Sequence, residues 1–253
     1  MSQFIDIAIL PAEAQLMEAD CYVVVDVLRA TTTLATMFSA GVTDVVVAAS
    51  EAEAREIAKR DGRLLCGEVN GLAPEGFDHG NSPLEIREAS PAGKPAVLFT
   101  TNGTRAFCAV AGQGRVLAGA LANLEAVATA AAEHETIAIV CAGNAGGRRF
   151  ALEDFATAAE IVQRVLVHSR GADTGDAAGL AIETAGYEDW IAASLPQQTD
   201  KSARALRASV HGRRTAEIGF GGDVHFAAQR NTSLAVPEVV AFGDGWARLE
   251  NRA

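Results

Sequence analysis

An acidic residue, an arginine and two hydroxyls follow the apolar run Val23–Val25 within a few positions: Asp26, Arg29, Thr31 and Thr32. A carboxylate can hold a divalent cation, and the planar guanidinium of arginine can grip an oxyanion with several donors. The apolar run predicts a buried strand, and the residues after Arg29 predict a helix whose first N–H groups favour an anion. The segment therefore predicts metal and phosphate binding, with Asp26 and Arg29 taking part in the chemistry and the two threonines binding substrate. The alternative interpretation is structural, with Thr31 capping the helix and Asp26 in an ion pair.

A second segment is the long polar stretch at residues 67–83, which is rich in glycine and proline and follows a predicted strand. Loops of this length are uncommon in compact domains and are often functional. Its candidates are Glu68 as a metal ligand, Asp78 or His79 as the acid for a leaving oxygen, and Asn81 as a substrate ligand. The alternative is a solvated loop in which the acidic and amide side chains cap turns.

Residues 100–105 form a third polar turn, which ends a predicted strand and enters a predicted helix. Gly103 lets an oxyanion approach the backbone closely, and Arg105 is unfavourable beside the positive end of a helix unless an anion offsets it. We therefore expect Arg105 to take part in the chemistry and four neighbours to bind substrate: Thr101, Asn102, Gly103 and Thr104. The alternative is an Asx turn with Thr104 as the helix cap.

The fourth segment joins a glycine-rich turn to two arginines and two acids. Arg148 and Arg149 are expected to bind a second anionic group of the substrate. Glu153 and Asp154 are expected to supply metal oxygens beside Asp26, because parallel strands deliver their C-terminal loops to one edge of a sheet. The alternative is that these two acids only cap the helix that follows.

Composition restricts the class of protein. The chain has 253 residues and a net charge of −11, which argues against a nucleic-acid partner but not against a small anionic substrate met by local positive charge. No run approaches the roughly 20 apolar residues of a membrane helix, and the first residues lack the features of a signal peptide. We therefore expect a cytoplasmic protein with no membrane partner. Its hydrophobic helices are compatible with a homodimer, although the sequence places no interface.

The four cysteines lie in or beside apolar stretches and lack metal-binding spacing, which predicts reduced, buried thiols. The interval from Cys141 to Arg148 is one residue longer than in the loop of cysteine-dependent phosphatases. Cys141 would also need a depressed pKa to act as a nucleophile, so a cysteinyl-phosphate mechanism is disfavoured.

Apolar runs alternate with amphipathic stretches along the first two thirds of the chain. The predicted strands are residues 5–10, 22–27, 44–48, 64–67, 96–100, 115–118 and 136–141. Predicted helices begin near Thr31, Ser50, Thr104, Asn123 and Leu152. Ser50 and Glu53 have the spacing of a capping box, which supports that helix start. The alternation predicts an α/β fold with three α/β/α layers and a largely parallel sheet.

The chain is expected to form a single α/β domain over residues 1–253. Residues 20–60 and 94–130 follow the same order of strand, polar turn, helix and strand, which suggests an internal duplication with Arg29 and Arg105 in comparable turns. Residues 168–253 are less regular. There we expect helices at residues 176–193 and 199–210, the latter ending at Gly212, and an edge strand at residues 235–240, because proline is tolerated at an edge.

With these segments identified, the chain resembles the 2-phosphosulfolactate phosphatase (ComB) family. The resemblance is carried in order by residues 25–33, residues 67–71 and 76–83, residues 100–105, and residues 141–143 with 149–154. A weaker C-terminal block adds Ser209 to Gly212, Asp223 to Phe226, and Val236 with Pro237. Several motifs at once make the resemblance specific, and it spans most of the chain.

The resemblance implies a magnesium-dependent phosphoric monoester hydrolase. In that family 2-phosphosulfolactate is hydrolysed to 3-sulfolactate and phosphate, on the route to coenzyme M. Mg²⁺ prefers oxygen ligands, and Asp26 is the first candidate, with Glu68 and Glu153 or Asp154 nearby. Asp26 is either a metal ligand that orients water or a nucleophile that forms an aspartyl phosphate. The ligand role is favoured because no second aspartate follows two residues later.

A non-catalytic sensor or carrier of a phosphorylated or sulfonated metabolite is the competing interpretation. The same arginines and helix starts would serve such a protein. A pure anion binder, however, has no need for four acids beside an anion, because they would repel it in the absence of a cation. The acids therefore favour the enzyme.

Overall fold

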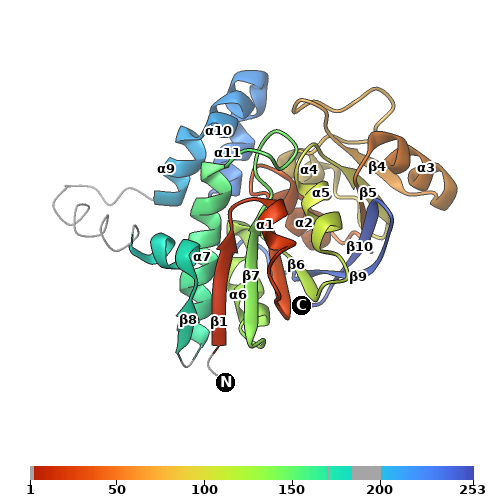
Figure 1. Cartoon of the computed structure of the whole chain (residues 1–253). Helices are drawn as coiled ribbons and strands as arrows, with labels where there is room; N and C mark the ends of the chain where they lie inside the picture. The colour runs from red at the N-terminus through yellow and green to blue at the C-terminus, as the bar shows by residue number, and fades with distance from the viewer. Residues whose placement is uncertain (1–2, 170, 184–200) are drawn as a thin grey trace.

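The computed structural model describes residues 3–169, 171–183 and 201–253 (Figure 1). Its centre is a ten-stranded sheet with the strand order β4-β5-β3-β10-β9-β6-β2-β7-β1-β8. The strands are β1 (Gln3–Ala8), β2 (Cys21–Val25), β3 (Val45–Ala48), β4 (Leu64–Gly67), β5 (Ala96–Phe99), β6 (Arg115–Gly119), β7 (Thr136–Cys141), β8 (Ala172–Thr174), β9 (Pro237–Gly243) and β10 (Trp246–Asn251). The seven strands predicted in the first two thirds of the chain are present; β4 and β7 have the predicted bounds, and the ends of the others shift by one or two residues.

The helices lie on both sides of this sheet, so the three-layer α/β/α architecture is confirmed (Figure 1). They are α1 (Pro11–Ala14), α2 (Ala30–Ser39), α3 (Glu51–Asp61), α4 (Pro83–Ala89), α5 (Gly103–Val110), η1 (Leu121–Asn123), α6 (Leu124–Ala131), α7 (Leu152–His168), α9 (Lys201–Ala208), α10 (Val210–Thr215), the π-helical turn η2 (Ala216–Phe220) and α11 (Gly221–Ala227). One of the two hydrogen bonds of the predicted capping box is present, since the Ser50 hydroxyl accepts the Glu53 N–H at 3.3 Å.

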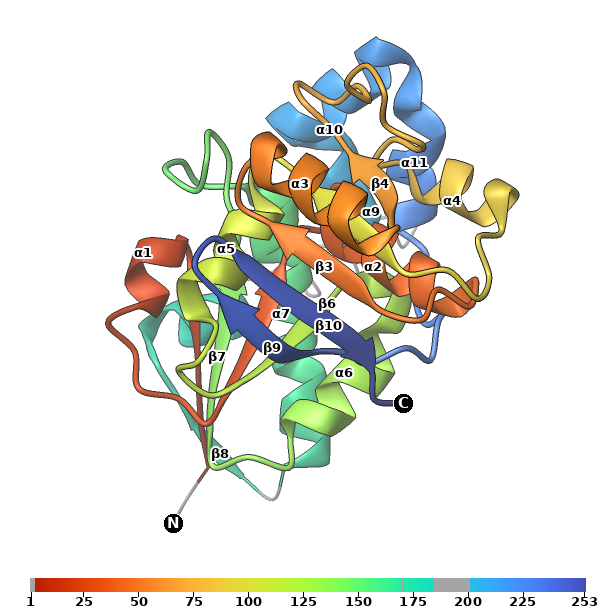
Figure 2. The same ribbon diagram turned by 90° about the vertical axis from the view of Figure 1, so that its right-hand side faces the viewer.

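The sheet consists of two parallel blocks that run in opposite senses. One block is β6-β2-β7-β1-β8 and the other is β3-β5-β4. The hairpin β9–β10 joins them by three antiparallel pairings, with β6, within the hairpin and with β3 (Figure 2). The sheet is therefore largely parallel, as predicted, but the expectation that a common parallel edge gathers the C-terminal loops does not hold across the two blocks.

The two blocks nevertheless enclose the same helices. Leu34 of α2 and Phe107 of α5 belong to one apolar cluster with Val24 of β2 and Val47 of β3. In a flat sheet β2 and β3 would lie about 19 Å apart, at roughly 4.8 Å per strand, whereas a helix is only about 10 Å wide. Because the single helix α5 contacts both β2 and β3, the sheet must curve around it. The loops that follow β2, β4 and β5 meet at the starts of α2 and α5, where Gly103 lies against Asp26 and Glu68 accepts the Thr101 N–H.

Each block is covered on its other face by separate helices. Strands β1, β2, β6 and β7 pack on α6 and α7, whereas β3 and β5 pack on α3. Figure 2 shows α3 on the outer side of β3 and β4. The two blocks thus share one inner layer and have different outer layers.

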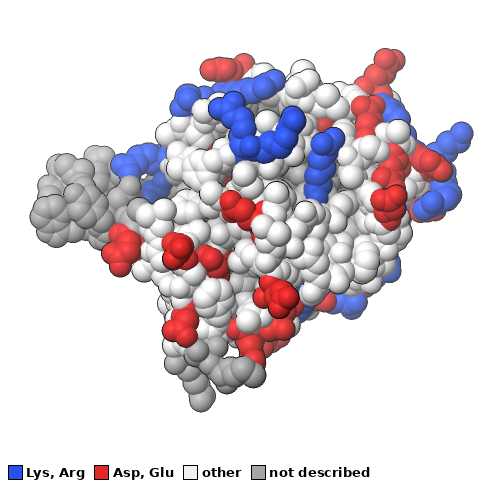
Figure 3. Space-filling model, viewed as in Figure 1, with Lys and Arg blue, Asp and Glu red and all other residues white. Residues whose placement is uncertain are grey.

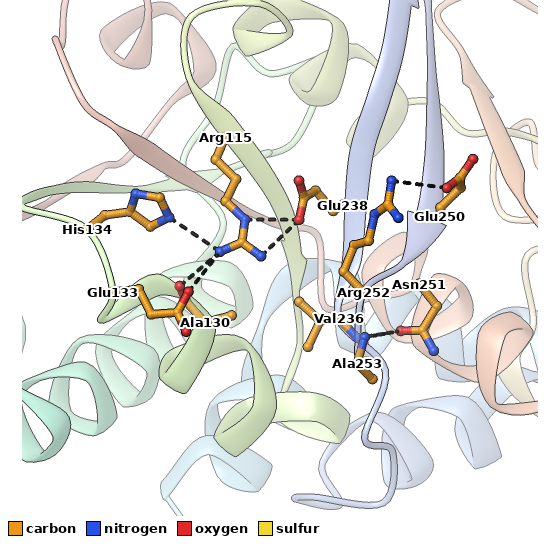
Figure 4. Close-up of polar contacts among 10 residues, drawn as sticks. All are labelled: Arg115, Ala130, Glu133, His134, Val236, Glu238, Glu250, Asn251, Arg252 and Ala253. Atoms are coloured by element: carbon orange, nitrogen blue, oxygen red, sulfur yellow. Dashed lines mark hydrogen bonds and ion pairs between the residues drawn. The ribbon is translucent and has the colours of Figure 1, made fainter.

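The seam between the blocks is narrow at β6 and β9, where the ladder pairs Leu117 with Glu238. Arg115 reinforces this seam, because its guanidinium bonds the Glu238 carboxylate at 2.9 Å and also reaches Glu133 and His134 (Figure 4). Close to the seam, the buried Asn123 amide donates to the carbonyl oxygens of residues 118 and 235. Side chains therefore supply much of the attachment that the short ladder lacks.

Two expectations for the C-terminal part are wrong. The strand near residue 237 lies inside the sheet, between β6 and β10; Pro237 is tolerated because it is the first residue of β9. Its hairpin partner β10 was not predicted, although Asp244-Gly245 is a common turn signal between apolar runs. Gly212 does not end a helix; it lies within α10, where its N–H donates to the Ser209 hydroxyl.

Two of the predicted C-terminal helices can be compared with the structure only in part. Residues 176–183 are helical, and the remainder of the predicted helix to residue 193 lies outside the described residues, as does the start of the one predicted at 199–210. All four cysteines are free thiols; three of them are buried as predicted, whereas Cys108 is only partly buried. No helix in the described parts of the chain has both the length and the apolar character needed to cross a membrane.

Candidate active site

Asp26 lies directly after β2 and at the start of α2. Its carboxylate accepts the backbone N–H of Ala30, and its carbonyl accepts the N–H of Thr31 at 2.9 Å. The helix begins at Ala30, with Arg29 in the N-cap position and no side chain of Arg29 capping it. The Asp26 residue is only 5% exposed. The N-terminus of α2 thus stabilises a buried carboxylate. With a cation beside that carboxylate, the same helix N-terminus would also favour a bound anion.

The start of α5 meets the start of α2 at this carboxylate. A Cβ atom added to Gly103 would lie 2.6 Å from Asp26 Oδ2 and 2.8 Å from the Ala30 Cβ. Glycine is therefore required for the two helix starts to approach so closely. The N-terminal turns of two helices, which both carry positive potential, converge on one carboxylate.

Further acids surround Asp26. Burial raises its pKa to about 6, and the charges of Glu68 and Glu153 act in the same direction, while His211 and the Ala30 N–H oppose them. Burial also raises the pKa of Asp154 well above its ordinary value, with Asp26 and Glu153 adding to the effect. The structure thus brings together the four acids that were predicted as metal ligands, on loops after β2 and β4 and at the start of α7.

Two of these acids are already engaged with the backbone. Glu68 accepts the N–H of Thr101 at 2.8 Å and that of Gly71 at 2.6 Å. Asp154 accepts the N–H of Val27 at 3.0 Å and that of Gly143 at 3.1 Å. Each carboxylate therefore ties two loops together, which is a structural contribution whether or not a metal ion binds.

Three buried side-chain polar atoms have no hydrogen-bond partner among the described residues: Arg63 Nε, which lies away from the site, and Glu153 Oε2 and Asn81 Oδ1. Buried oxygens without partners are uncommon in folded proteins, and a bound ligand or ion would satisfy them. Glu153, whose charge acts on Asp26, therefore has an oxygen available for a cation beside Asp26. Within the described part of the chain, no group of three His, Cys, Asp or Glu side chains is arranged to hold a metal ion.

The predicted arginines lie in different environments. Arg29 is buried and ion-paired with Asp223 at 2.8 Å, so part of its donor capacity is used within the chain. Arg105 is exposed and its Nη1 lies beside Gly146 of the loop between β7 and α7. Arg148 and Arg149 are exposed in that same loop. Figure 3 shows Lys and Arg side chains gathered over this loop and α10, although the chain as a whole is acidic.

Most of the predicted hydroxyls bond to the chain itself. Thr31 Oγ accepts the Asp26 N–H, Thr32 donates to the Val27 carbonyl, and Thr104 donates to the Thr100 carbonyl. These interactions shape the two helix starts. Thr101 is exposed, and the Asn102 side chain accepts the Gly146 N–H at 2.9 Å, which links the turn before α5 to the arginine-bearing loop.

Asp78, predicted as a catalytic acid, lies on the outer edge of the sheet. It is exposed, and its carboxylate accepts the Leu65 N–H at 2.8 Å, while the Asp78 N–H donates to the Leu65 carbonyl. This pairing extends β4 rather than the Asp26 cluster. The catalytic role of Asp78 stays a prediction.

Two residues near the site were not predicted as functional. His211 of α10 exerts the strongest opposing charge on Asp26, and Asp223 of α11 is the ion-pair partner of Arg29. Both belong to the weaker C-terminal block of the resemblance. No spacing or periodicity marked them, because they reach the site from almost 200 residues further along the chain.

The cysteinyl-phosphate mechanism finds no support in the structure. Cys141 is fully buried in β7, and burial raises the pKa of its thiol well above the ordinary value, with Asp154 adding to the effect. Such a thiol stays protonated and unreactive.

A cavity of about 770 Å³ lies between α7 and α9 and is lined largely by apolar side chains such as Phe155, Ala159 and Ala205. None of the predicted site residues lines it. The candidate site is therefore defined by converging charges and helix starts rather than by this cavity.

Comparison with known proteins agrees with these motifs. The family model described as 2-phosphosulpholactate phosphatase matches residues 9–241. A protein of Thermotoga maritima named probable 2-phosphosulfolactate phosphatase is 36% identical over 236 residues, which cover 93% of this chain and 95% of the relative. Proteins with the same name from Deinococcus radiodurans and a Synechococcus strain are 36% and 38% identical, covering 89% and 83% of this chain and 90% and 85% of the relatives.

Proposed function

The chain belongs to the 2-phosphosulpholactate phosphatase family, and we propose that it is a Mg²⁺-dependent enzyme that hydrolyses 2-phosphosulfolactate to 3-sulfolactate and phosphate. The observation that carries the proposal is the position of Asp26. Its buried carboxylate lies where two helix N-termini meet, beside further acids and below a group of exposed arginines. That arrangement suits a cation and a phosphoryl group together.

The residues present fit a magnesium ion. The buried Glu153 oxygen lacks a partner, and burial with neighbouring negative charge raises the pKa of Asp26, so a cation would relieve both. Mg²⁺ usually takes one or two carboxylates and completes its shell with water and substrate phosphate, so a full cage of protein ligands is not required. Asp26 and Glu153 would hold the ion. When bound, it would neutralise charge on the phosphoryl group during displacement.

In this proposal residues of the chain hold the phosphoryl group in position for the reaction. The start of α5 at Gly103 and the Arg105 guanidinium would hold phosphoryl oxygens, which stabilises charge as it moves to them. Water oxygen attacks phosphorus, the bond from phosphorus to the ester oxygen breaks, and that oxygen takes up a proton to become the hydroxyl of 3-sulfolactate. In this proposal Asp26 orients the ion and the attacking water rather than forming a covalent intermediate.

The exposed arginines of the loop between β7 and α7 favour a substrate with a second anionic group. Arg148 and Arg149 lie on the loop that contacts Arg105 and Asn102, close to the helix starts. A sulfonate or carboxylate of the substrate would reach them while its phosphate occupies the helix N-termini. The cytoplasmic location, the place in coenzyme M biosynthesis and the homodimer stay predictions.

The test is phosphate release from racemic 2-phosphosulfolactate with Mg²⁺ and with EDTA, beside a panel of other phosphomonoesters. The expected result is metal-dependent release that favours the sulfonated ester. Release that favours other esters would support the phosphatase activity and reject 2-phosphosulfolactate as the substrate. No release from any ester, together with binding of inorganic phosphate, would support a non-catalytic sensor instead.

A second test separates the two roles of Asp26. Hydroxylamine reacts with an aspartyl phosphate but not with a carboxylate that only orients the ion and water, so hydroxylamine trapping during turnover is the deciding measurement. Conversion of Asp26 to a hydroxamate would show the covalent route.

A further inference from the structure

A buried network joins the C-terminal helices to the loops around Asp26. Arg29 Nη1 bonds Asp223 Oδ2 at 2.8 Å, and both side chains are nearly inaccessible, with exposures of 3% and 1%. The other Asp223 oxygen accepts the Ser82 hydroxyl at 2.7 Å. The Phe220 ring lies 4.4 Å from the Arg29 guanidinium carbon. Three segments far apart in sequence therefore meet at one carboxylate.

Two routes lead from this network to Asp26. In the first, Arg29 immediately precedes Ala30, whose N–H is bonded to the Asp26 carboxylate. In the second, Arg29 Nη2 donates to the Gly71 carbonyl at 2.6 Å, and the Gly71 N–H donates to Glu68. Glu68 in turn holds the Thr101 N–H, directly before α5. A shift of Arg29 would therefore move both helix starts.

The C-terminal segment also touches the glycine loop directly. A Cβ atom added to Gly71 would lie 2.4 Å from Ile218 Cδ1 of η2, so the Ile218 side chain packs directly on the loop backbone at Gly71. His211, whose charge acts on Asp26, belongs to the same segment, at α10. The position of residues 209–227 is thus coupled to the loop at Gly71 and to the site.

A buried ion pair contributes little net stability compared with a well-packed apolar replacement, whereas its fixed geometry orients the groups around it. We propose that Asp223 is a positioning residue of the phosphatase reaction, which acts through Arg29 and Gly71 to hold the starts of α2 and α5 around the Asp26 carboxylate. The proposal rests on the proposed function. It assigns a role to a residue that lies outside the four segments from which the site was predicted.

The test compares Asp223→Asn with Asp44→Asn. The first change is isosteric and keeps an acceptor for Ser82 while removing the charge that fixes Arg29. The second removes the carboxylate of another Arg–Asp pair, Asp44 with Arg63, which lies at the N-terminal end of β3 and is more exposed. We expect Asp223→Asn to lower kcat by about 10- to 100-fold with KM changed less than threefold, as for residues that orient catalytic ligands. Asp44→Asn should leave kcat unchanged.

Two further measurements separate positioning from loss of folding. Arg29→Met with Asp223→Asn should be no slower than Arg29→Met alone, because Asp223 acts through Arg29 and the two effects do not add. If Asp223→Asn does not fold, Ser82→Ala, which removes one hydrogen bond from Asp223, should lower kcat by several-fold. Additive losses, or a kcat of Asp223→Asn equal to that of Asp44→Asn, would overturn the proposal.

The outcome is distinguishable from failure of the phosphatase function itself. Turnover by the wild type establishes that function independently of any variant. If the wild type releases no phosphate, the proposed function fails, and the positioning role is then measured by the affinity for inorganic phosphate with Mg²⁺. In that case Asp223→Asn should bind inorganic phosphate at least tenfold more weakly than the wild type, and equal affinity would reject the positioning role as well.

Discussion

Arg29 and Arg105 each follow a strand and lie at a helix start, and these two helix starts touch each other. Their side chains nevertheless lie in opposite environments. Arg29 occupies the N-cap of α2, and its guanidinium is buried against Asp223, Gly71 and Phe220. Arg105 is the third residue of α5, and its side chain is exposed beside the loop between β7 and α7. A buried, paired arginine fixes the position of other groups, whereas an exposed one retains its donors for a ligand.

The difference follows from what packs on each turn. The turn at Arg29 is covered by η2 and α11, which come from the end of the chain and bring an aromatic ring and a carboxylate. The turn at Arg105 faces the glycine-rich loop at residues 143–147, which has small side chains and leaves the guanidinium accessible. Similar local sequence in the suggested duplication therefore does not imply similar function.

Asp26 is the group that both turns share, so its replacement should have the largest effect. Asp26→Asn removes the charge that holds the cation and should lower kcat by about a thousandfold or more, comparable with removal of a central catalytic group. Phosphate release with Mg²⁺ measures it. Activity within tenfold of the wild type would show that the assignment is wrong.

Loss of the buried arginine should be the next largest effect and should appear in stability. Arg29→Met leaves Asp223 as an uncompensated buried charge and should lower the free energy of unfolding by about 3 kcal/mol or more. Urea denaturation at pH 7 measures the change. Arg105→Met is the matched control and should stay within about 0.5 kcal/mol of the wild type, as expected for an exposed position. Equal losses of unfolding free energy in the two variants would contradict the difference inferred between Arg29 and Arg105.

The Asp26 carboxylate should also destabilise the metal-free protein at neutral pH. Burial raises its pKa in the folded state from 3.8 to about 6. Below pH 4 the group is protonated in both folded and unfolded chains, and the cost develops as pH rises to about 6. Since a tenfold change in acidity corresponds to about 1.4 kcal/mol, Asp26→Asn should be more stable than the wild type by about 3 kcal/mol at pH 8.

That stability difference should vanish near pH 3, where Asp26 is neutral in the wild type as well. Denaturant curves of both proteins in EDTA across this range would measure it. A constant difference at all pH values would instead indicate a packing effect of the substitution. Added Mg²⁺ should reduce the difference, because a bound cation stabilises the ionised carboxylate of the wild type.

The smallest expected effect is on substrate binding by the exposed arginine. Arg105→Gln retains a polar side chain but removes the charge, and should raise KM for a phosphomonoester about tenfold, equivalent to about 1.4 kcal/mol. Steady-state kinetics at two salt concentrations measures it, because an exposed charge is screened by salt. An unchanged KM would indicate that phosphate is held by the helix N-termini without this arginine.

The local patterns determined much of the architecture. Apolar runs with β-branched residues predicted seven strands, and cap residues such as Ser50 located helix starts to within a residue or two, because these signals depend on neighbouring residues. The same local signals identified Asp26, Glu68 and Glu153 as acidic residues beyond strand ends and Gly103 as a turn residue. Their proximity was predicted as well, but for a reason that does not hold across the two blocks.

Only the tertiary structure decided how these residues meet. The β9–β10 hairpin inserts between two oppositely directed blocks, and α2 and α5 pack against both of them, so the loops after β2, β4 and β5 meet although no common parallel edge joins them. The burial of Arg29, the ion pair with Asp223 and the charge of His211 near Asp26 likewise depend on residues 209–227 returning to the site. Local sequence specifies backbone conformation and polarity, whereas the partner of a buried charge is set by long-range packing, which carries no signal in the spacing of neighbouring residues.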